Sequence, residues 1–161
     1  MEPRNLAVIA ASSLAPGTAA FGVPMPDHQV RHGQGAGGVR LGMSEAQVVK
    51  VLGRPAVRRS ARTELGTFVD LTWPGIQVRR WEGAGGRVVT ITVTDRGIRM
   101  ANGIGVGSTV AAVRARLPRA RCGSDPLLCT LGDPQPSNTV TTLRFGTAGR
   151  VTELSVTRMV A

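Results

Sequence analysis

The sequence is poor in the side chains that build most catalytic and base-stacking sites. It has no tyrosine, two tryptophans and three phenylalanines. Surfaces that stack nucleobases use many more aromatic side chains. The two histidines, His28 and His32, lie in a segment rich in glycine and proline, where a helix that could present them as metal ligands is not expected. Nucleophilic catalysis needs a base beside its nucleophile, so we predict no enzyme, no cofactor and no metal site.

Lysine is nearly absent as well. Lys50 is the only lysine among 20 basic residues, and the net charge is +10. Such a charge favours acidic partners, which include acidic protein surfaces, anionic polymers and nucleic acid. A GC-rich genome would produce the same arginine bias, so the arginine count alone does not choose among these partners.

Cysteine is limited to Cys122 and Cys129, which enclose six residues. A disulfide across so short a loop is feasible and would suit an oxidising compartment. The alternatives are two reduced thiols or a degenerate metal site. A metal site would need two further ligands, and none stands at a suitable spacing.

No segment near the N-terminus is long enough for a comfortable membrane span. The apolar run from Leu6 to Ala20 follows Arg4 and is rich in small residues, so we predict a signal peptide over residues 1–20. A disordered tail is the alternative. Residues 21–37 contain many glycines and prolines and predict a flexible linker. We therefore expect a secreted or cell-envelope protein without a transmembrane span.

A short helix is predicted after the linker. Ser44 and Gln47 have the spacing of a capping box, and apolar residues follow at helical intervals. Gly53 and Pro55 then end the pattern. These signals predict a helix over residues 44–52.

Three strands are predicted next, over residues 67–73, 76–81 and 88–94. In the last, valine and isoleucine alternate with threonine, which predicts apolar side chains in the core and threonines outward. Strict alternation would place Trp81 outside. Because Trp81 aligns with Phe145 later in the chain, we expect a bulge that turns Trp81 into the core.

The same order of signals recurs, which indicates an internal repeat. Thr109 takes the place of Ser44, and residues 149–157 align with residues 86–94. We predict repeat 1 over residues 38–100 and repeat 2 over residues 101–161. The expected fold class is α+β, with two tandem repeats that each pack a short helical segment on an antiparallel sheet of three to four strands.

The segment from Gly42 to Pro55 resembles the opening of BamE-like (SmpA/OmlA) modules, which read Gly-Met-Ser/Thr, then Val, Leu-Gly and Pro at fixed intervals. About 14 residues carry this resemblance. Two such modules in tandem resemble the β-lactamase inhibitory protein family, whose repeats each pack a helical hairpin on a four-stranded sheet. The resemblance implies an exported binding module, and it implies a disulfide just after the second helix. The first repeat departs from that pattern because it has no cysteines.

We therefore predict an exported, non-enzymatic protein-interaction module that is monomeric and binds a protein or acidic surface in the envelope or extracellular space. One alternative is a basic binder of nucleic acid or anionic polymer, with nucleic acid the less favoured ligand. The other is a structural or assembly factor of the cell envelope. The predicted partner-binding residues are arginines after each helix and on a strand, with one tryptophan: Arg58, Arg59, Arg62, Trp73, Arg79, Arg80, Arg119 and Arg121.

Overall fold

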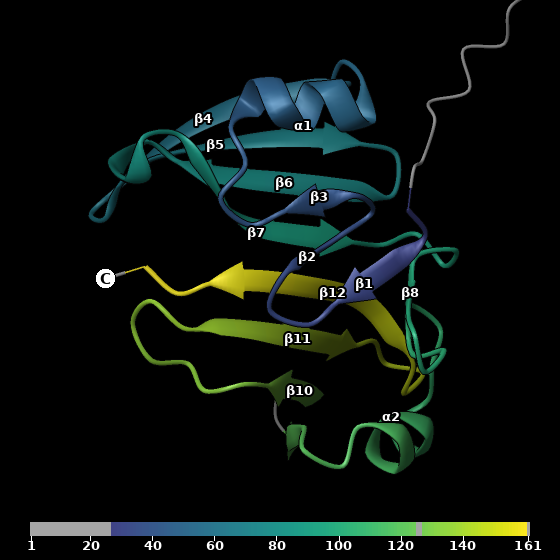
Figure 1. Ribbon diagram of the computed structural model, residues 1–161. Helices are drawn as coiled ribbons and strands as arrows, with labels where there is room; N and C mark the ends of the chain where they lie inside the picture. Colours follow the sequence, from purple (N-terminus) through teal and green to yellow (C-terminus); the bar gives the residue numbers. More distant parts are fainter. Residues whose placement is uncertain (1–26, 125–126, 161) are drawn as a thin grey trace, which may run out of the picture.

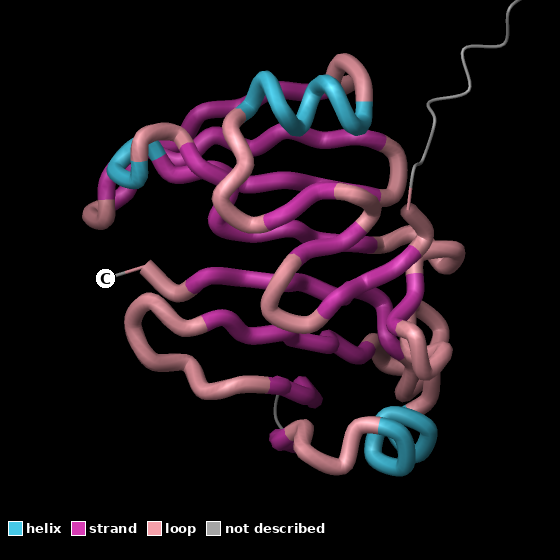
Figure 2. The backbone as a smooth tube through the Cα atoms, viewed as in Figure 1, coloured by secondary structure: helices cyan, strands magenta, loops and turns pink. Residues whose placement is uncertain are grey.

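The protein is built mainly from β-strands, with two short α-helices (Figure 1; Figure 2). The computed structural model describes residues 27–124 and 127–160. The predicted signal peptide over residues 1–20 lies outside the described residues, as does the first part of the predicted linker.

Eight antiparallel strands form the larger sheet, in the order β4-β5-β6-β7-β12-β11-β10-β9. At the centre of this sheet β7 pairs with β12, and Ile91 of β7 lies opposite Val156 of β12. The strands are β4 (Val57–Thr63), β5 (Gly66–Trp73), β6 (Ile76–Trp81), β7 (Arg87–Val93), β9 (Arg121–Ser124), β10 (Leu127–Leu131), β11 (Thr139–Phe145) and β12 (Val151–Arg158).

A smaller sheet has the order β3-β2-β1-β8, with β1 parallel to β8. Its strands are β1 (Gln29–Arg31), β2 (Gly35–Ala36), β3 (Val39–Arg40) and β8 (Arg99–Met100). The end of the segment predicted as a linker thus contains two strands. It folds because Val30 and Ala36 are buried in the core, each 3% exposed.

Both helices have the N-cap residues that the sequence predicts. α1 (Glu45–Leu52) has Ser44 as its N-cap with a complete capping box, and its C-cap is Gly53. α2 (Val110–Arg116) has Thr109 as its N-cap, whose hydroxyl accepts from the Ala112 backbone N–H. The 3-10 turn η1 (Glu82–Ala84) joins β6 to β7.

One face of the larger sheet, here called the inner face, carries the core. It presents the buried side chains of Val69, Leu71, Val78, Ile91 and Leu154. α1 and the smaller sheet lie over this face in Figure 1. The segment before α1 is tied to β7, because the Gly42 N–H donates to the Val88 carbonyl at 2.8 Å and the Val88 N–H donates to the Met43 carbonyl at 2.9 Å.

The expected fold class is wrong. The chain is mostly β, and its strands form one eight-stranded sheet beside a four-stranded sheet instead of separate helix-on-sheet repeats. Pairing of β7 with β12 merges the strands from both halves of the chain. Local periodicity predicts strands but not their partners, because cross-strand pairing depends on residues far apart in sequence.

The opposite face of the larger sheet, here called the outer face, is uncovered. In the described part of the chain no helix or strand lies over it (Figure 1). Side chains on its two central strands, Thr90, Thr92, Ser155 and Thr157, are all partly exposed. If another layer covered this face, the side chains on its central strands would be buried. Their partial exposure shows that the outer face is in contact with solvent.

Candidate functional site

A row of short polar side chains crosses the outer face from strand to strand. All six members are partly exposed. Adjacent strands lie about 4.8 Å apart, so the row is about 24 Å long. The pairing register sets the succession as Thr72, Gln77, Thr92, Ser155, Thr142 and Thr130. The middle of the outer face is therefore an uncharged surface of hydroxyl and amide groups.

An aromatic and arginine cluster lies beside this row, at the β5–β6 end of the face. The Phe68 and Trp81 rings stack with centroids 6.2 Å apart and planes 18° from parallel. The Arg79 guanidinium carbon lies 5.7 Å from the Phe68 centroid, within the range of a cation–π contact. Asp70 holds that guanidinium through Nε at 2.7 Å and Nη2 at 2.9 Å. This ion pair raises the pKa of Arg79.

Trp81 is held in one orientation by its surroundings. Its indole N–H donates to the Leu65 carbonyl at 2.8 Å. Two glycines leave room for the ring, since a Cβ added to Gly83 would lie 2.5 Å from Trp81 Cε2 and one added to Gly66 would lie 3.1 Å from Trp81 Nε1. The ring is thus pre-positioned, which lowers the entropy lost when a partner contacts it.

Each of the stacked rings lines a hollow. The first includes Phe68 and the second includes Trp81. The first is lined by Ala61, Thr63, Glu64, Leu65, Phe68 and Arg79, and the second by Gly42, Trp81, Arg87, Val88, Val89, Ser137, Arg158, Met159 and Val160. Apolar side chains beside arginines are the composition of protein-binding surfaces. Leu65 is 53% exposed at the tip of the β4–β5 turn.

The predicted inward turn of Trp81 is wrong. β6 alternates strictly, so Val78 and Arg80 face inward while Arg79 and Trp81 face outward. A bulge is present, but the extra residue belongs to β7: Thr90 pairs with Arg79 and Val88 with Arg80. Val89, which the alternation with threonine placed in the core, is buried at 4% exposed, and the bulge buries Val88 as well, at 1% exposed. Phe145, expected to match Trp81, is buried.

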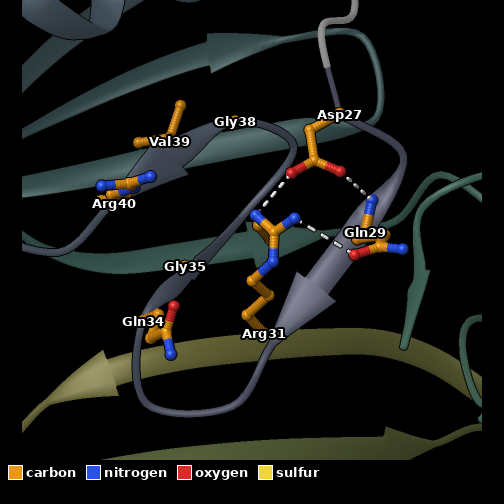
Figure 3. Close-up of a pocket in the computed structure, with 9 residues that line it drawn as sticks. Asp27, Gln29, Arg31, Gln34, Gly35, Gly38, Val39 and Arg40 are labelled. Carbon is orange, nitrogen blue, oxygen red and sulfur yellow. Dashed lines mark hydrogen bonds and ion pairs between the residues drawn. The ribbon is translucent and has the colours of Figure 1, made fainter. Parts of the chain in front are cut away.

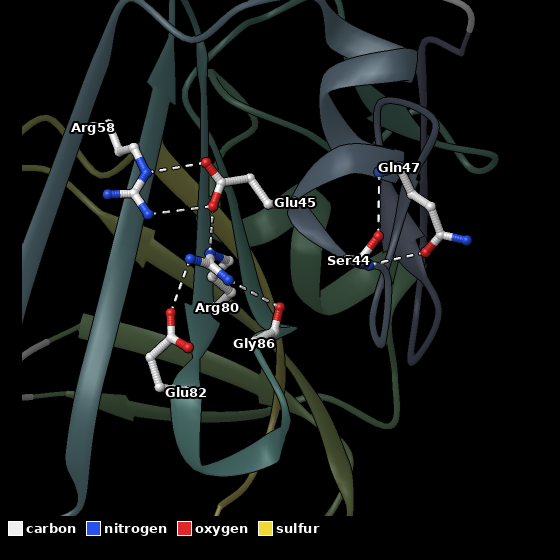
Figure 4. A network of polar contacts seen from close by, with 7 residues as sticks. All are labelled: Ser44, Glu45, Gln47, Arg58, Arg80, Glu82 and Gly86. Carbon is white, nitrogen blue, oxygen red and sulfur yellow. Dashed lines mark hydrogen bonds and ion pairs between the residues drawn. The ribbon is translucent and has the colours of Figure 1, made fainter.

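Three of the predicted partner-binding residues make contacts within the fold. Trp73 is 5% exposed, and its indole N–H donates to the Gly53 carbonyl at 3.2 Å, below the end of α1. Arg80 lies on the inner face with 13% of its side chain exposed. Arg58 donates to Glu45 from Nε at 3.0 Å and Nη2 at 3.4 Å (Figure 4).

The Glu45 carboxylate joins these two arginines. Arg80 Nε lies 2.8 Å from Glu45 Oε2 without the alignment of a hydrogen bond, so that contact is an ion pair. Arg80 Nη2 lies 2.8 Å from Glu82 (Figure 4). The side-chain hydrogen bond and the charge of Glu45 raise the pKa of Arg58. The network fixes the start of α1 on β4 and β6.

The remaining predicted arginines divide between the two edges of the larger sheet. Arg59 and Arg62 are exposed on β4, and Arg79 lies two strands away on β6. Arg121 lies on β9, at the opposite edge, and Arg119 just precedes it. Seven strand spacings separate the edges, about 34 Å. Arg59 and Arg79 thus share the outer face near one edge of the sheet, Arg62 lies on the opposite face of β4, and Arg119 and Arg121 lie at the other edge.

Phe68, Asp70 and Leu65 belong to the cluster but were not predicted from the sequence. The alternation along residues 67–73 could have placed Phe68 and Asp70. Because side chains alternate along a strand, Val69 and Leu71 in the core imply that Phe68 and Asp70 point to the outer face. Their pairing with Trp81 and Arg79 required the β5–β6 register.

The predicted disulfide is confirmed. Cys122 and Cys129 are bonded and face each other across β9 and β10. Among residues 27–124 and 127–160, no group of three or more His, Cys, Asp or Glu side chains is arranged to hold a metal ion. Within the same ranges no helix is long and apolar enough to cross a membrane.

Two further polar features serve the fold. In a small pocket of the smaller sheet the polar lining residues bond to one another: Arg31 donates to Asp27 Oδ2 at 2.7 Å and to Gln29 Oε1 at 3.2 Å (Figure 3). His32 Nδ1 lies 2.8 Å from the hydroxyl of buried Thr141. Burial lowers the pKa of His32.

Comparison with known proteins adds no family to this description. No protein-family model, curated protein sequence or solved structure matches the chain. The resemblance of residues 42–55 to BamE-like modules therefore stays a prediction from sequence.

Proposed function

We propose that this protein is an exported, non-enzymatic binding module that docks an acidic protein surface on the outer face of its larger sheet. The observation that carries the proposal is the Phe68–Trp81 pair, which is partly exposed on an uncovered face and has Arg79 over it. Tryptophan and arginine are the side chains most enriched at the energetic centres of interfaces.

Export is supported by two independent features. The Cys122–Cys129 disulfide is of the kind that persists in oxidising compartments. The apolar run from Leu6 to Ala20 has the composition of a signal peptide. An acidic partner is supported by the net charge of +10 and by Arg87 and Arg158, which line the hollow beside Trp81.

A polyanion binder is the second hypothesis, and the structure gives it less support. Arg58, Arg79 and Arg80 are each paired with a carboxylate. Of the other predicted arginines, Arg59 and Arg62 lie at one edge of the sheet and Arg119 and Arg121 at the other. These four therefore do not form one continuous track for a phosphate backbone.

The test is capture of partners by the purified protein from culture medium and envelope extract, followed by affinity measurement on each captured protein. Trp81→Ala should weaken binding by at least about tenfold, because a central interface tryptophan contributes 2 kcal/mol or more. Leu128→Ala, on the outer face at β10, is the matched control and should stay within about twofold. Equal binding by Trp81→Ala and the native protein would contradict the proposal, and a steep salt-dependent affinity for DNA alone would favour the second hypothesis.

A further inference from the structure

The larger sheet ends in a long and fully exposed edge strand. β4 pairs with β5 through seven consecutive residue pairs, from Val57–Thr72 to Thr63–Gly66. All seven of its residues are exposed. In the described part of the chain no strand pairs with its other side. An edge of this kind presents unpaired backbone N–H and C=O groups to solvent.

The geometry of the β4–β5 turn determines which backbone N–H and C=O groups of β4 point away from β5. Residues Glu64 and Leu65 form a two-residue turn, so Thr63 and Gly66 make the hydrogen-bonded pair that closes it. Hydrogen-bonded and non-hydrogen-bonded pairs alternate along an antiparallel ladder. Arg58, Ser60 and Arg62 therefore direct their N–H and C=O groups away from β5.

We propose that β4 accepts an extended, acidic segment of a partner protein, which adds to the sheet as a ninth strand. Backbone hydrogen bonds to the outward-facing groups would supply affinity, and alternate side chains would supply specificity. Arg59 and Arg62 lie on opposite faces of β4, and neither forms an ion pair among the described residues. Glutamate or aspartate on the added strand would pair with them on both faces.

The same arginines select against two other occupants. A second copy of β4, paired antiparallel about Ser60, would place each Arg58 opposite the other copy's Arg62. Like charges across a strand pair are destabilising. The chain's own first 26 residues contain one carboxylate, Glu2, and four prolines. Proline has no backbone N–H to donate to a neighbouring strand. This segment therefore has neither the negative charge nor the backbone donors that an added strand beside β4 needs.

The first hollow adds a requirement on the partner's sequence. Ala61 and Thr63 line that hollow together with Leu65 and Phe68. Ala61 shares the outer face with Arg59, two residues away along β4. The preferred segment therefore carries an acidic residue near Arg59 and a bulky apolar residue two positions along. This edge site rests on β4 and does not depend on docking at Trp81.

The test uses the full-length protein and a fluorescent, end-capped octapeptide of two Glu-Glu-Val-Val repeats, which places a glutamate and a valine two positions apart on each face of the added strand. Binding is followed by anisotropy. We expect the peptide to bind and to slow amide exchange at Ser60. The same peptide with lysine in place of glutamate should bind at least about tenfold more weakly, because it places like charges at the arginines. Ser60→Pro removes one outward N–H without touching the ladder to β5, and Arg59→Glu reverses one charge. Each should weaken binding about tenfold, while Arg114→Glu, an equal charge change on exposed α2, should stay within about twofold.

Three results would each overturn the proposal: absence of binding by the glutamate peptide, equal binding of the lysine peptide, or full-strength binding by Ser60→Pro. Thermal melting checks that the proline variant is folded. Should it not fold, N-methylation of alternate peptide amides supplies the same test from the ligand side. A methylated peptide that binds as well as the parent shows that no strand is added.

Discussion

Glu45→Gln tests whether one carboxylate holds α1 to the sheet. Glu45 is the first residue of α1 and lies 2.8 Å from Arg80 Nε and 3.0 Å from Arg58 Nε. Glutamine keeps the shape of the side chain and removes its charge. Arg80, whose side chain is 13% exposed, then retains only Glu82 as an ionic partner among the described residues.

The expected loss in the free energy of unfolding is about 2–3 kcal/mol. Breaking a fully buried pair costs about 3–5 kcal/mol. Arg80 keeps Glu82 and some contact with water, which reduces this to about 1.5–2 kcal/mol. Loss of a negative charge in the first turn of α1 adds about 0.3–1 kcal/mol. The contact with Arg58 is open to solvent, so we assign it no separate contribution.

Urea unfolding at neutral pH measures the change by linear extrapolation. Glu82→Gln is the control, because Glu82 is 44% exposed, and it should cost less than about 1 kcal/mol. Adding Arg80→Met to Glu45→Gln should restore stability, since it removes the cation that the first change leaves uncompensated. The reasoning fails if Glu45→Gln costs no more than Glu82→Gln, or if Arg80→Met lowers the stability of the Glu45→Gln protein further.

Three other changes have defined outcomes. Replacing Cys122 and Cys129 with alanine should lower the free energy of unfolding by about 2.5 kcal/mol in urea, as expected for an eight-residue closed loop; a loss under about 0.5 kcal/mol would contradict this. Because the folded-state pKa of His32 is lowered, the unfolded chain binds protons first, and stability should fall as the pH drops below about 6.5. His32→Gln should reduce this loss of stability at low pH. The prediction is refuted if denaturant titrations give the variant and the native protein the same dependence of stability on pH. Gly83→Ala should displace Trp81, shift its fluorescence and weaken partner binding, whereas an unchanged spectrum would show that the ring does not rest on Gly83.

Local signals predicted the helices and the central strands closely. The capping box at Ser44 and the cap at Thr109 act between neighbouring residues, so the sequence contains all that is needed to place them. β6 has the predicted bounds, and β5 and β7 differ from prediction by one residue. Apolar alternation marks these strands because one of their faces is buried.

β4 was missed for the opposite reason. An edge strand that is exposed on both faces has no buried side to impose alternation, so its sequence, rich in arginine, gave no strand signal. The segment that contains β1 and β2 was assigned to a linker because its glycines and prolines suggest turns. Its two short strands form only through contact with the rest of the protein.

The sequence by itself determined where α1 and α2 begin, which faces of β5 and β6 are apolar, and that Cys122 and Cys129 lie close enough to bond, because these depend on neighbours along the chain. Only the tertiary structure decided that β7 joins β12, that the bulge lies in β7, and that Trp81 therefore stacks on Phe68 at the surface. The contacts of the arginines also depend on the tertiary structure. Arg58, Arg59 and Arg80 carry the same charge, but only Arg58 and Arg80 lie on the face of the sheet where they reach Glu45.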